Sequence, residues 1–221
     1  MMRGAIFDMD GVLVDSQPVH MRAWRRFFQS IGKPVAEKEM EFILEGRKRE
    51  DILHHFLGEL TAEQMLSPSR QKELLFREEA STIKTIPGIQ SFLEQLVRAS
   101  IRLAVASCGG SGRVHHLLGY LALRDYFQVV ITGDQVREGK PDPTIFHKAA
   151  AELKTMPEEV LVVEDSIAGI QAAKAAGMKC LGIARSHRAQ VLLEAGAYHV
   201  LPDFLSVSVE EFQELFTSRS Q

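Results

Sequence analysis

The stretch Gly4-Ala5-Ile6-Phe7-Asp8-Met9-Asp10-Gly11-Val12 decides how the rest of the chain is interpreted. It begins as an apolar run and closes with two aspartates and a glycine, which is typical of an interior strand delivering carboxylates at its carboxyl end. In open α/β sheets ligands bind at that end. Strand alternation places Asp8 and Asp10 on one side and Met9 on the other. Two carboxylates so close together favour a hard divalent cation, so we predict Mg²⁺ here; the alternative is that both aspartates cap the following turn.

Composition sets the broad class of the protein. The 221 residues are 45% hydrophobic and 25% charged, which is ordinary for a globular protein. A net charge of −3 and a pI near 6.3 give no reason to expect a nucleic-acid or anionic-membrane partner. No apolar stretch approaches the roughly 18 residues of a membrane span, and three aspartates within the first fifteen residues argue against a signal peptide. Two cysteines do not make a disulfide framework. We expect a cytoplasmic protein and take it to be a monomer.

The segment 16–84 shows helical periodicity and no convincing strand. Apolar residues recur at steps of three to five between Val19 and Ile31, which suits an amphipathic helix. Thr61 and Gln64 have the spacing of a capping box, and we expect the helix they start to break near Pro68. The sequence therefore predicts an all-helical domain of four or five helices at 16–84, inserted into a core domain made of 1–15 and 85–221.

After Pro87 the pattern changes to strictly alternating helix and strand. Such alternation predicts a parallel, doubly wound (Rossmann-like) α/β sheet with right-handed crossovers. We expect strands at 101–106, 129–131, 160–163, 179–183 and 198–200. We expect helices at 89–98, 114–120, 144–153, 167–176, 188–195 and 209–216.

Polar residues follow several of the predicted strands, in addition to the two aspartates of the first. Ser107 ends the second strand, Glu164 and Asp165 end the fourth, and Lys140 lies in a connecting loop. Parallel strands bring these ends to one edge of the sheet, where a cation, a lysine and a hydroxyl donor suit phosphoryl transfer. Gly109-Gly110, before a helix, adds backbone N–H groups able to cradle a phosphate. The same set also describes a phospho-receiver signalling module that accepts phosphate without turnover.

These motifs, in this order, resemble the haloacid dehalogenase (HAD) superfamily, in its β-phosphoglucomutase-like phosphatase branch. The resemblance covers essentially the whole chain, with 16–84 matching the family's helical cap. The matching pieces are Asp8-Met9-Asp10-Gly11-Val12, Ala106-Ser107, Gly139-Lys140-Pro141-Asp142-Pro143 and Val163-Glu164-Asp165-Ser166 with Gly169 and Gly177.

The resemblance implies a role for each core residue. Asp8 would be the nucleophile that forms an aspartyl-phosphate, and Asp10 would protonate the leaving alcohol and then activate water. Ser107 and Lys140 would hold the transferring phosphoryl group. Mg²⁺ would be bound by the carboxylates of Asp8 and Asp165, by the backbone carbonyl of Asp10, and by Glu164 as a neighbouring or water-mediated ligand.

The resemblance also implies phosphate ester chemistry on a small phosphorylated metabolite, because dehalogenases of this group lack an acid at the position of Asp10. We expect a sugar-phosphate phosphatase, with a β-phosphoglucomutase-type mutase as the alternative. Glu45 stands where the mutase cap has a lysine, and the 108–111 loop lacks the mutase's charged donors, so we expect poor binding of a second phosphate. The expected substrate-binding residues are His20, Gly46, Arg49, Ser107, Cys108 and Gly109.

Overall fold

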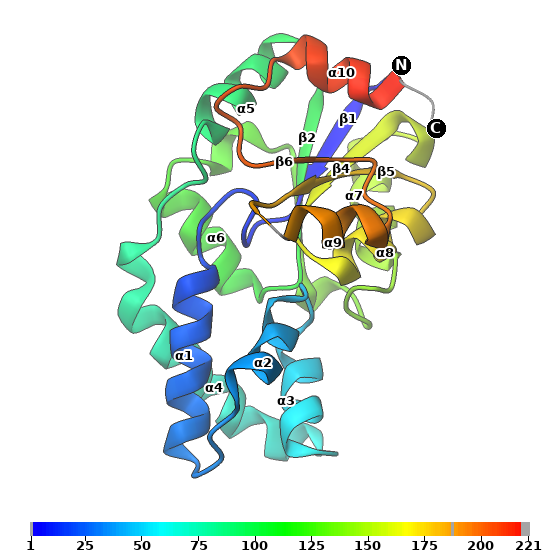
Figure 1. The fold of residues 1–221 in the computed structure, drawn as a ribbon. Helices are drawn as coiled ribbons and strands as arrows, with labels where there is room; N and C mark the ends of the chain where they lie inside the picture. The colour runs from blue at the N-terminus through cyan, green and yellow to red at the C-terminus, as the bar shows by residue number, and fades with distance from the viewer. Residues whose placement is uncertain (1, 187, 218–221) are drawn as a thin grey trace.

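The computed structural model describes residues 2–186 and 188–217 and shows two units, an α/β core and a helical cap (Figure 1). In the described part of the chain, six strands form one parallel sheet in the order β3-β2-β1-β4-β5-β6. Their bounds are β1 Gly4–Phe7, β2 Arg102–Ser107, β3 Val129–Thr132, β4 Val160–Glu164, β5 Lys179–Ile183 and β6 His199–Leu201. The predicted doubly wound parallel sheet with an inserted helical cap is confirmed.

Strand β1 lies in the interior of the sheet, and every one of its residues is buried. It pairs with β2 on one side and β4 on the other, so Phe7 lies level with Val105 and Val163. Ala5 and Phe7 pack into one apolar layer and Ile6 into the other, which is the period of two expected of a strand. The four-residue run therefore reads as continuously apolar because it is covered on both faces.

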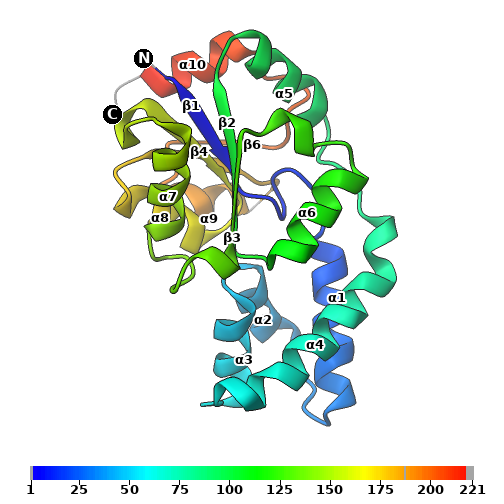
Figure 2. The ribbon, with the colours of Figure 1, turned by 180° about the vertical axis from the view of Figure 1, so that it is seen from behind.

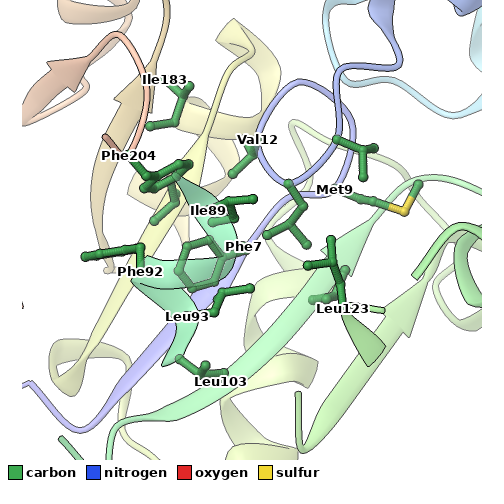
Figure 3. Close-up of a cluster of buried hydrophobic side chains, with 14 of the residues drawn as sticks. Phe7, Met9, Val12, Ile89, Phe92, Leu93, Leu103, Leu123, Ile183 and Phe204 are labelled. Carbon is green, nitrogen blue, oxygen red and sulfur yellow. The ribbon is translucent and has the colours of Figure 1, made fainter. Parts of the chain in front are cut away.

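Helices cover the two faces of the sheet (Figures 1 and 2). On the Phe7 face, Phe92 stacks on Phe204 at a ring-centroid distance of 5.3 Å, within the cluster shown in Figure 3. The helices of this face are α5 (Ile89–Arg98), α6 (Ser111–Tyr120) and α10 (Val209–Thr217). Those of the other face are α7 (Thr144–Leu153), α8 (Ile167–Ala175) and α9 (Arg188–Ala195). Among the described residues, none of the helices is both long and apolar enough to cross a membrane.

The cap has its own apolar core. Trp24, Phe27 and Phe28 are almost fully buried and contact one another at ring-centroid distances of 5.2–5.6 Å. They come from one face of the first cap helix, as their spacing predicted. The cap helices are α1 (Gln17–Ser30), α2 (Glu37–Met40), α3 (Arg49–Leu57) and α4 (Ala62–Glu79), and the short 3₁₀ segments Glu41–Leu44 and Ala80–Thr82 complete the cap.

The predicted break at Pro68 is wrong, because α4 runs without interruption from Ala62 to Glu79. Its start is as predicted: the Gln64 amide donates to the Thr61 hydroxyl, and the Thr61 amide donates to the Gln64 side chain. Pro68 lacks the N–H that would bond one turn back. Contacts along α1 on both sides of the proline hold the helix together, so tertiary packing overrides the local preference.

Two chain segments join the cap to the core, and they pair with each other. The Asp15 amide donates to the Lys84 carbonyl at 2.8 Å, and the Ile86 amide donates to the Leu13 carbonyl at 3.0 Å. The crossings are thus a short two-stranded ribbon rather than two loose linkers. The domain limits at 15/16 and 84/85 remain a prediction, and this ribbon marks where the chain enters and leaves the cap.

Candidate active site

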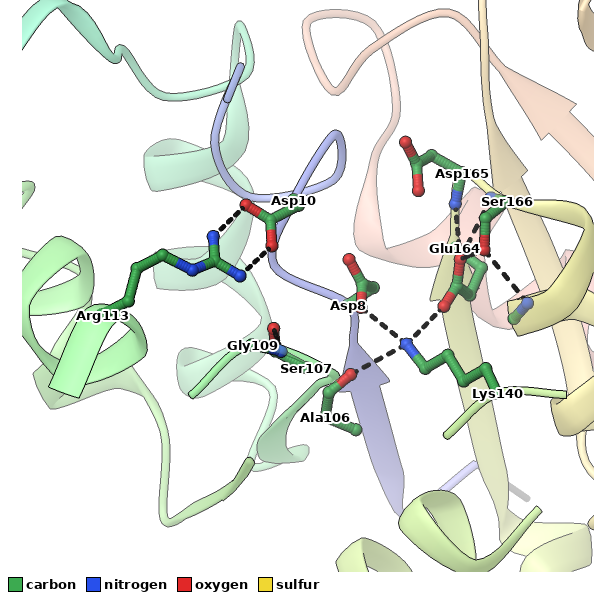
Figure 4. Close-up of polar contacts among 11 residues, drawn as sticks. Asp8, Asp10, Ala106, Ser107, Gly109, Arg113, Lys140, Glu164, Asp165 and Ser166 are labelled. Carbon is green, nitrogen blue, oxygen red and sulfur yellow. Dashed lines mark hydrogen bonds and ion pairs between the residues drawn. The ribbon is translucent and has the colours of Figure 1, made fainter. Parts of the chain in front are cut away.

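The carboxyl ends of β1, β2 and β4 meet at the edge of the sheet that faces the cap (Figure 4). Asp8 follows β1, Ser107 is the last residue of β2, and Glu164 is the last residue of β4. All three are buried, at 5% or less of their surface. Right-handed parallel connections thus assemble residues that lie up to 156 positions apart, as the sequence predicted.

Lys140 is enclosed in this cluster. Its ammonium donates to Asp8 Oδ1 at 2.6 Å, to Glu164 Oε1 at 2.5 Å and to the Ala106 carbonyl at 3.0 Å. Burial alone would lower its pKa, but the two carboxylates raise it well above the usual value for lysine. The side chain has no exposed surface, so the possibility that Lys140 is an ordinary surface lysine is excluded.

Both carboxylate oxygens of Glu164 accept hydrogen bonds from other residues of the protein. One oxygen accepts from Lys140, and the other accepts from the amides of Asp165 and Ser166 and from the Ser166 hydroxyl. The Gly169 amide donates to the same hydroxyl, so Ser166 caps α8. Glu164 therefore fixes Lys140 and the start of α8. Both carboxylate oxygens of Glu164 already accept hydrogen bonds from the protein. Its role as a neighbouring or water-mediated metal ligand stays a prediction.

Negative charge exceeds positive charge around Asp8 and Asp165. Burial, followed by Glu164, raises the pKa of Asp165 well above its usual value. Burial also raises the pKa of Asp8 to about 7, although Lys140 opposes it. A divalent cation between these carboxylates would offset the repulsion.

The donor set fits Mg²⁺ on chemical grounds. The Asp165 carboxylate accepts from Gln17 and lies against Gly11, where φ is +81° and a Cβ atom would overlap the carboxylate. Because Gly11 directly follows Asp10, the Asp165 carboxylate lies next to the peptide unit that contains the Asp10 carbonyl. Within residues 2–186 and 188–217, no three His, Cys, Asp or Glu side chains converge as a metal cluster. Mg²⁺ does not require one, because one or two carboxylates with waters and phosphate oxygens suffice.

Asp10 is held by a residue that the sequence analysis missed. Arg113 donates from Nη1 and Nη2 to the two carboxylate oxygens of Asp10, both at 2.8 Å. Ser16 donates to Oδ1 at 2.5 Å, and His20 lies 3.3 Å from it. Burial would raise the pKa of Asp10, but Arg113 and His20 hold it well below its usual value. The loop 108–111 itself lacks the mutase's charged donors, but Arg113, two residues further on, packs over Gly109 and brings a cation beside the loop.

The cap closes the other side of the pocket. Gly46 has a φ of +73° and approaches Ser166 so closely that a Cβ atom would overlap its hydroxyl oxygen. His20, Gly46 and Arg49, the three predicted cap residues, all line the pocket, as do Cys108 and Gly109 of the core. Burial raises the pKa of the Cys108 thiol to about 11, which disfavours a thiolate nucleophile.

Lys72 is the second residue that the sequence analysis missed. It is 4% exposed, and its ammonium lies 2.9 Å from His20 Nδ1 and over the rings of Trp24 and Phe76. Burial and then Arg113 lower its pKa to about 7. Burial and then Lys72 lower the pKa of His20 to about 3.

The sequence did hold a signal for both missed residues. Arg113 is the third residue of α6, and a cation at a helix N-terminus opposes the helix dipole, so another interaction must favour it there. Lys72 lies seven residues after Met65 and four before Phe76, on the buried stripe of α4. A charge at such a position requires a partner across the interface.

Comparison with known proteins agrees with this fold. The haloacid dehalogenase-like hydrolase family matches residues 5–183, and the chain belongs to that family. Its sequence is 36% identical over 210 residues to a phosphorylated carbohydrates phosphatase of Thermotoga maritima, covering 89% of this chain and 92% of the relative. It is 33% identical over 191 residues to a β-phosphoglucomutase of Bacillus subtilis, covering 82% and 83%. The crystal structure of a β-phosphoglucomutase from Clostridium difficile superposes with a TM-score of 0.87 at 26% identity, covering 98% and 97% of the two chains.

Proposed function

We propose that the protein hydrolyses a phosphate monoester of a small metabolite, of the sugar-phosphate class, through an aspartyl-phosphate on Asp8. The observation that carries this proposal is that the buried Asp8 lines the pocket with one oxygen held by the buried Lys140. Lys140 neutralises part of the charge that the incoming phosphate must approach. The phosphatase name of the Thermotoga relative supports the same reaction.

The reaction divides into two displacements at phosphorus. A carboxylate oxygen of Asp8 attacks the phosphorus atom, and the bond to the ester oxygen breaks while Asp10, in its protonated form, gives that oxygen a proton. Because Arg113 holds the pKa of Asp10 well below its usual value, Asp10 must leave Arg113 before it can take up this proton. Asp10, now ionised, takes a proton from water, whose oxygen attacks the same phosphorus and releases inorganic phosphate with Asp8 restored. Ser107 and Lys140 hold the phosphoryl oxygens during both steps. Closure of the cap keeps other water away.

A divalent cation is part of this proposal. The Asp8 and Asp165 carboxylates and the Asp10 carbonyl would hold Mg²⁺, with Glu164 adjacent. The bound ion would neutralise the phosphoryl oxygens and favour the ionised form of Asp8, whose pKa is raised to about 7 by burial and, to a smaller extent, by Glu164 and Asp10. Gln17 would orient Asp165 toward the ion.

The test removes the nucleophile and the cation separately. We expect Asp8→Asn to abolish release of inorganic phosphate from a panel of sugar phosphates, and EDTA to do the same to the wild type until Mg²⁺ is restored. Asp125→Asn, at an exposed aspartate, is the matched control and should keep wild-type turnover. Undiminished turnover by Asp8→Asn would exclude the phosphoaspartate mechanism. One equivalent of the alcohol released without inorganic phosphate would favour the phospho-receiver alternative, because the phosphoryl group would then stay on Asp8.

A mutase is the second candidate, and one observation favours it. Glu45, which we expected to repel a second phosphate, is paired with Arg47 at 3.0 Å, and Arg113 brings a cation to the loop that lacks the mutase donors. We still propose hydrolysis, because the loop 108–111 carries no charged side chain of its own and the phosphorylated carbohydrates phosphatase of Thermotoga maritima is 36% identical to this chain. Supplying β-glucose 1-phosphate with a trace of the 1,6-bisphosphate distinguishes the two: free phosphate supports hydrolysis, and predominant glucose 6-phosphate would overturn it.

A further inference from the structure

Arg113 lies at the boundary between core and cap, in a position that the proposed mechanism does not use. Its side chain is only 10% exposed, and its guanidinium lies 5.2 Å from the centre of the Phe76 ring of the cap and packs over Gly109 of the core. Its two terminal nitrogens both donate to Asp10 (Figure 4). A planar fork on a carboxylate is strong and directional pairing, so Arg113 is a built part of the pocket.

This pair conflicts with the task of Asp10. Both carboxylate oxygens are turned toward Arg113, and Oδ1 also accepts from Ser16. Asp10 cannot present an oxygen to the leaving group until the fork opens. An opened fork leaves a buried guanidinium without an anion, which is strongly unfavourable unless a new anion replaces Asp10.

Lys72, another cation that lines the pocket, contacts His20 and two aromatic rings, so among the described residues it holds no hydrogen-bonded carboxylate that catalysis must displace. Three further cations of the lining have partners away from Asp10. Arg47 pairs with Glu45, Arg49 lies within 3.6 Å of Glu50 and Glu73, and Lys48 donates to two backbone carbonyls of the core. Arg113 is thus the cation whose present partner catalysis must take away. Glu73 also acts on Arg113 electrostatically, but the hydrogen-bonded partner is Asp10.

We propose that Arg113 selects substrates that carry a second anionic group, a carboxylate or a phosphate, besides the phosphate ester at Asp8; this inference rests on the proposed function. The second anion takes the guanidinium fork, and Asp10 is freed to face the ester oxygen. A substrate with a neutral far end leaves the Arg113–Asp10 pair in place and turns over slowly. Arg113 is in this sense a specificity-determining residue.

The experiment uses pairs of substrates that differ in one anionic group. In the carboxylate pair, sorbitol 6-phosphate and 6-phosphogluconate are both linear, and the first ends in a hydroxymethyl group where the second ends in a carboxylate. In the phosphate pair, fructose 6-phosphate is compared with fructose 1,6-bisphosphate. In the wild type we expect kcat/KM for at least one doubly anionic substrate to exceed that of its neutral match by about tenfold or more. In Arg113→Gln that ratio falls toward one, and sorbitol 6-phosphate is turned over faster than by the wild type. Arg98→Gln, at an exposed arginine, keeps the wild-type ratio.

A binding measurement separates this inference from the proposed function. In an Asp8→Asn background, calorimetry should show tighter binding of 6-phosphogluconate than of sorbitol 6-phosphate, or of the bisphosphate than of fructose 6-phosphate, and Arg113→Gln should remove the difference. If the wild type releases no phosphate, the proposed function fails while the affinities still test Arg113. Ratios and affinities that are unchanged in Arg113→Gln overturn the inference. If Arg113→Gln does not fold, Arg113→Lys decides, because it keeps the charge and loses the fork.

Discussion

Two buried lysines show how the same residue type acts differently at the scale of single side chains. Lys140 meets two carboxylates, which hold its pKa above the usual value, whereas Lys72 meets a histidine and two aromatic rings and has a pKa of about 7. The position of Lys140 in its Pro-flanked motif could be predicted from the sequence. The contacts of Lys72 could not, because its partner His20 lies 52 residues away on another helix.

Replacing Lys140 tests the first of these environments. Lys140→Met leaves Asp8 and Glu164 buried with no cation between them, so we expect a loss of about 3–5 kcal/mol in the free energy of unfolding and loss of phosphate release. Urea unfolding at neutral pH without added metal measures the first effect. Lys174→Met, on an exposed face of α8, is the control and should be near neutral. Wild-type stability in Lys140→Met would mean that the cluster does not need this cation.

The second environment predicts a pH dependence. The folded pKa of Lys72, about 7, lies below its ordinary value of 10.5, so the unfolded chain binds more protons between these values. The free energy of unfolding therefore rises with pH through this window, and burying the charged lysine costs most below pH 7. We expect Lys72→Met to stabilise the fold at pH 6 by on the order of a few kcal/mol and to add little at pH 10. Urea titrations at pH 6, 8 and 10 check this, with exposed Lys38→Met as the reference; an equal gain at all three pH values would contradict it.

At the scale of helices and strands, periodicity was sufficient wherever turn residues bracketed it. The predicted bounds of α5, α7, β5 and α9 agree with the structure to the residue. Helix α6 begins three residues before its predicted start, at Ser111, because its first turn, with Arg113, has no apolar pattern. The position of Arg113 at a helix N-terminus indicates that it needs a partner, but the identity of that partner, Asp10, could not be predicted, because the two residues lie 103 positions apart. Local pattern finds elements, whereas their mutual contacts depend on the assembled sheet.

The uninterrupted α4 helix allows a prediction at the same scale. Pro68→Ala restores an N–H that can bond one turn back and removes the clash of the ring, while the unfolded chain gains some freedom. We expect a net gain of about 2 kcal/mol in the free energy of unfolding, measured by urea unfolding with helix content followed by circular dichroism. Pro202→Ala, at an exposed loop proline, should give no gain. No gain in Pro68→Ala would mean that α4 bends to accommodate the ring at no cost.

At the scale of the whole molecule, the cap lies against the core through apolar side chains such as Val19 and Phe76, which share a buried cluster with the core, and through polar contacts. Its outline as an inserted helical block could be predicted from periodicity, but its position over the sheet edge could not, because single side chains set it. Lys48 is one of these: its ammonium donates to the Val136 and Arg137 carbonyls at 3.1 and 3.2 Å, and its methylenes pack on Gly139, next to Lys140. The two paired segments at Asp15 and Lys84, which connect the cap covalently to the core, form another part of the same interface.

Lys48 therefore holds the cap against the core, and its removal should shift the cap toward more open arrangements. Lys48→Ala deletes two charge-assisted hydrogen bonds between cap and core but leaves the ribbon in place, so the cap keeps its attachment and loses a restraint on its rotation. We expect a larger radius of gyration by small-angle X-ray scattering in the absence of substrate, together with a several-fold rise in KM, because substrate must then supply the closure free energy. Lys38→Ala, at an exposed lysine on α2, should change neither quantity. An unchanged radius of gyration in Lys48→Ala together with a raised KM would contradict this prediction and would mean that Lys48 contacts the substrate. The position of the cap would then depend on the close approach of Gly46 to Ser166 and on the packing of Arg113 over Phe76.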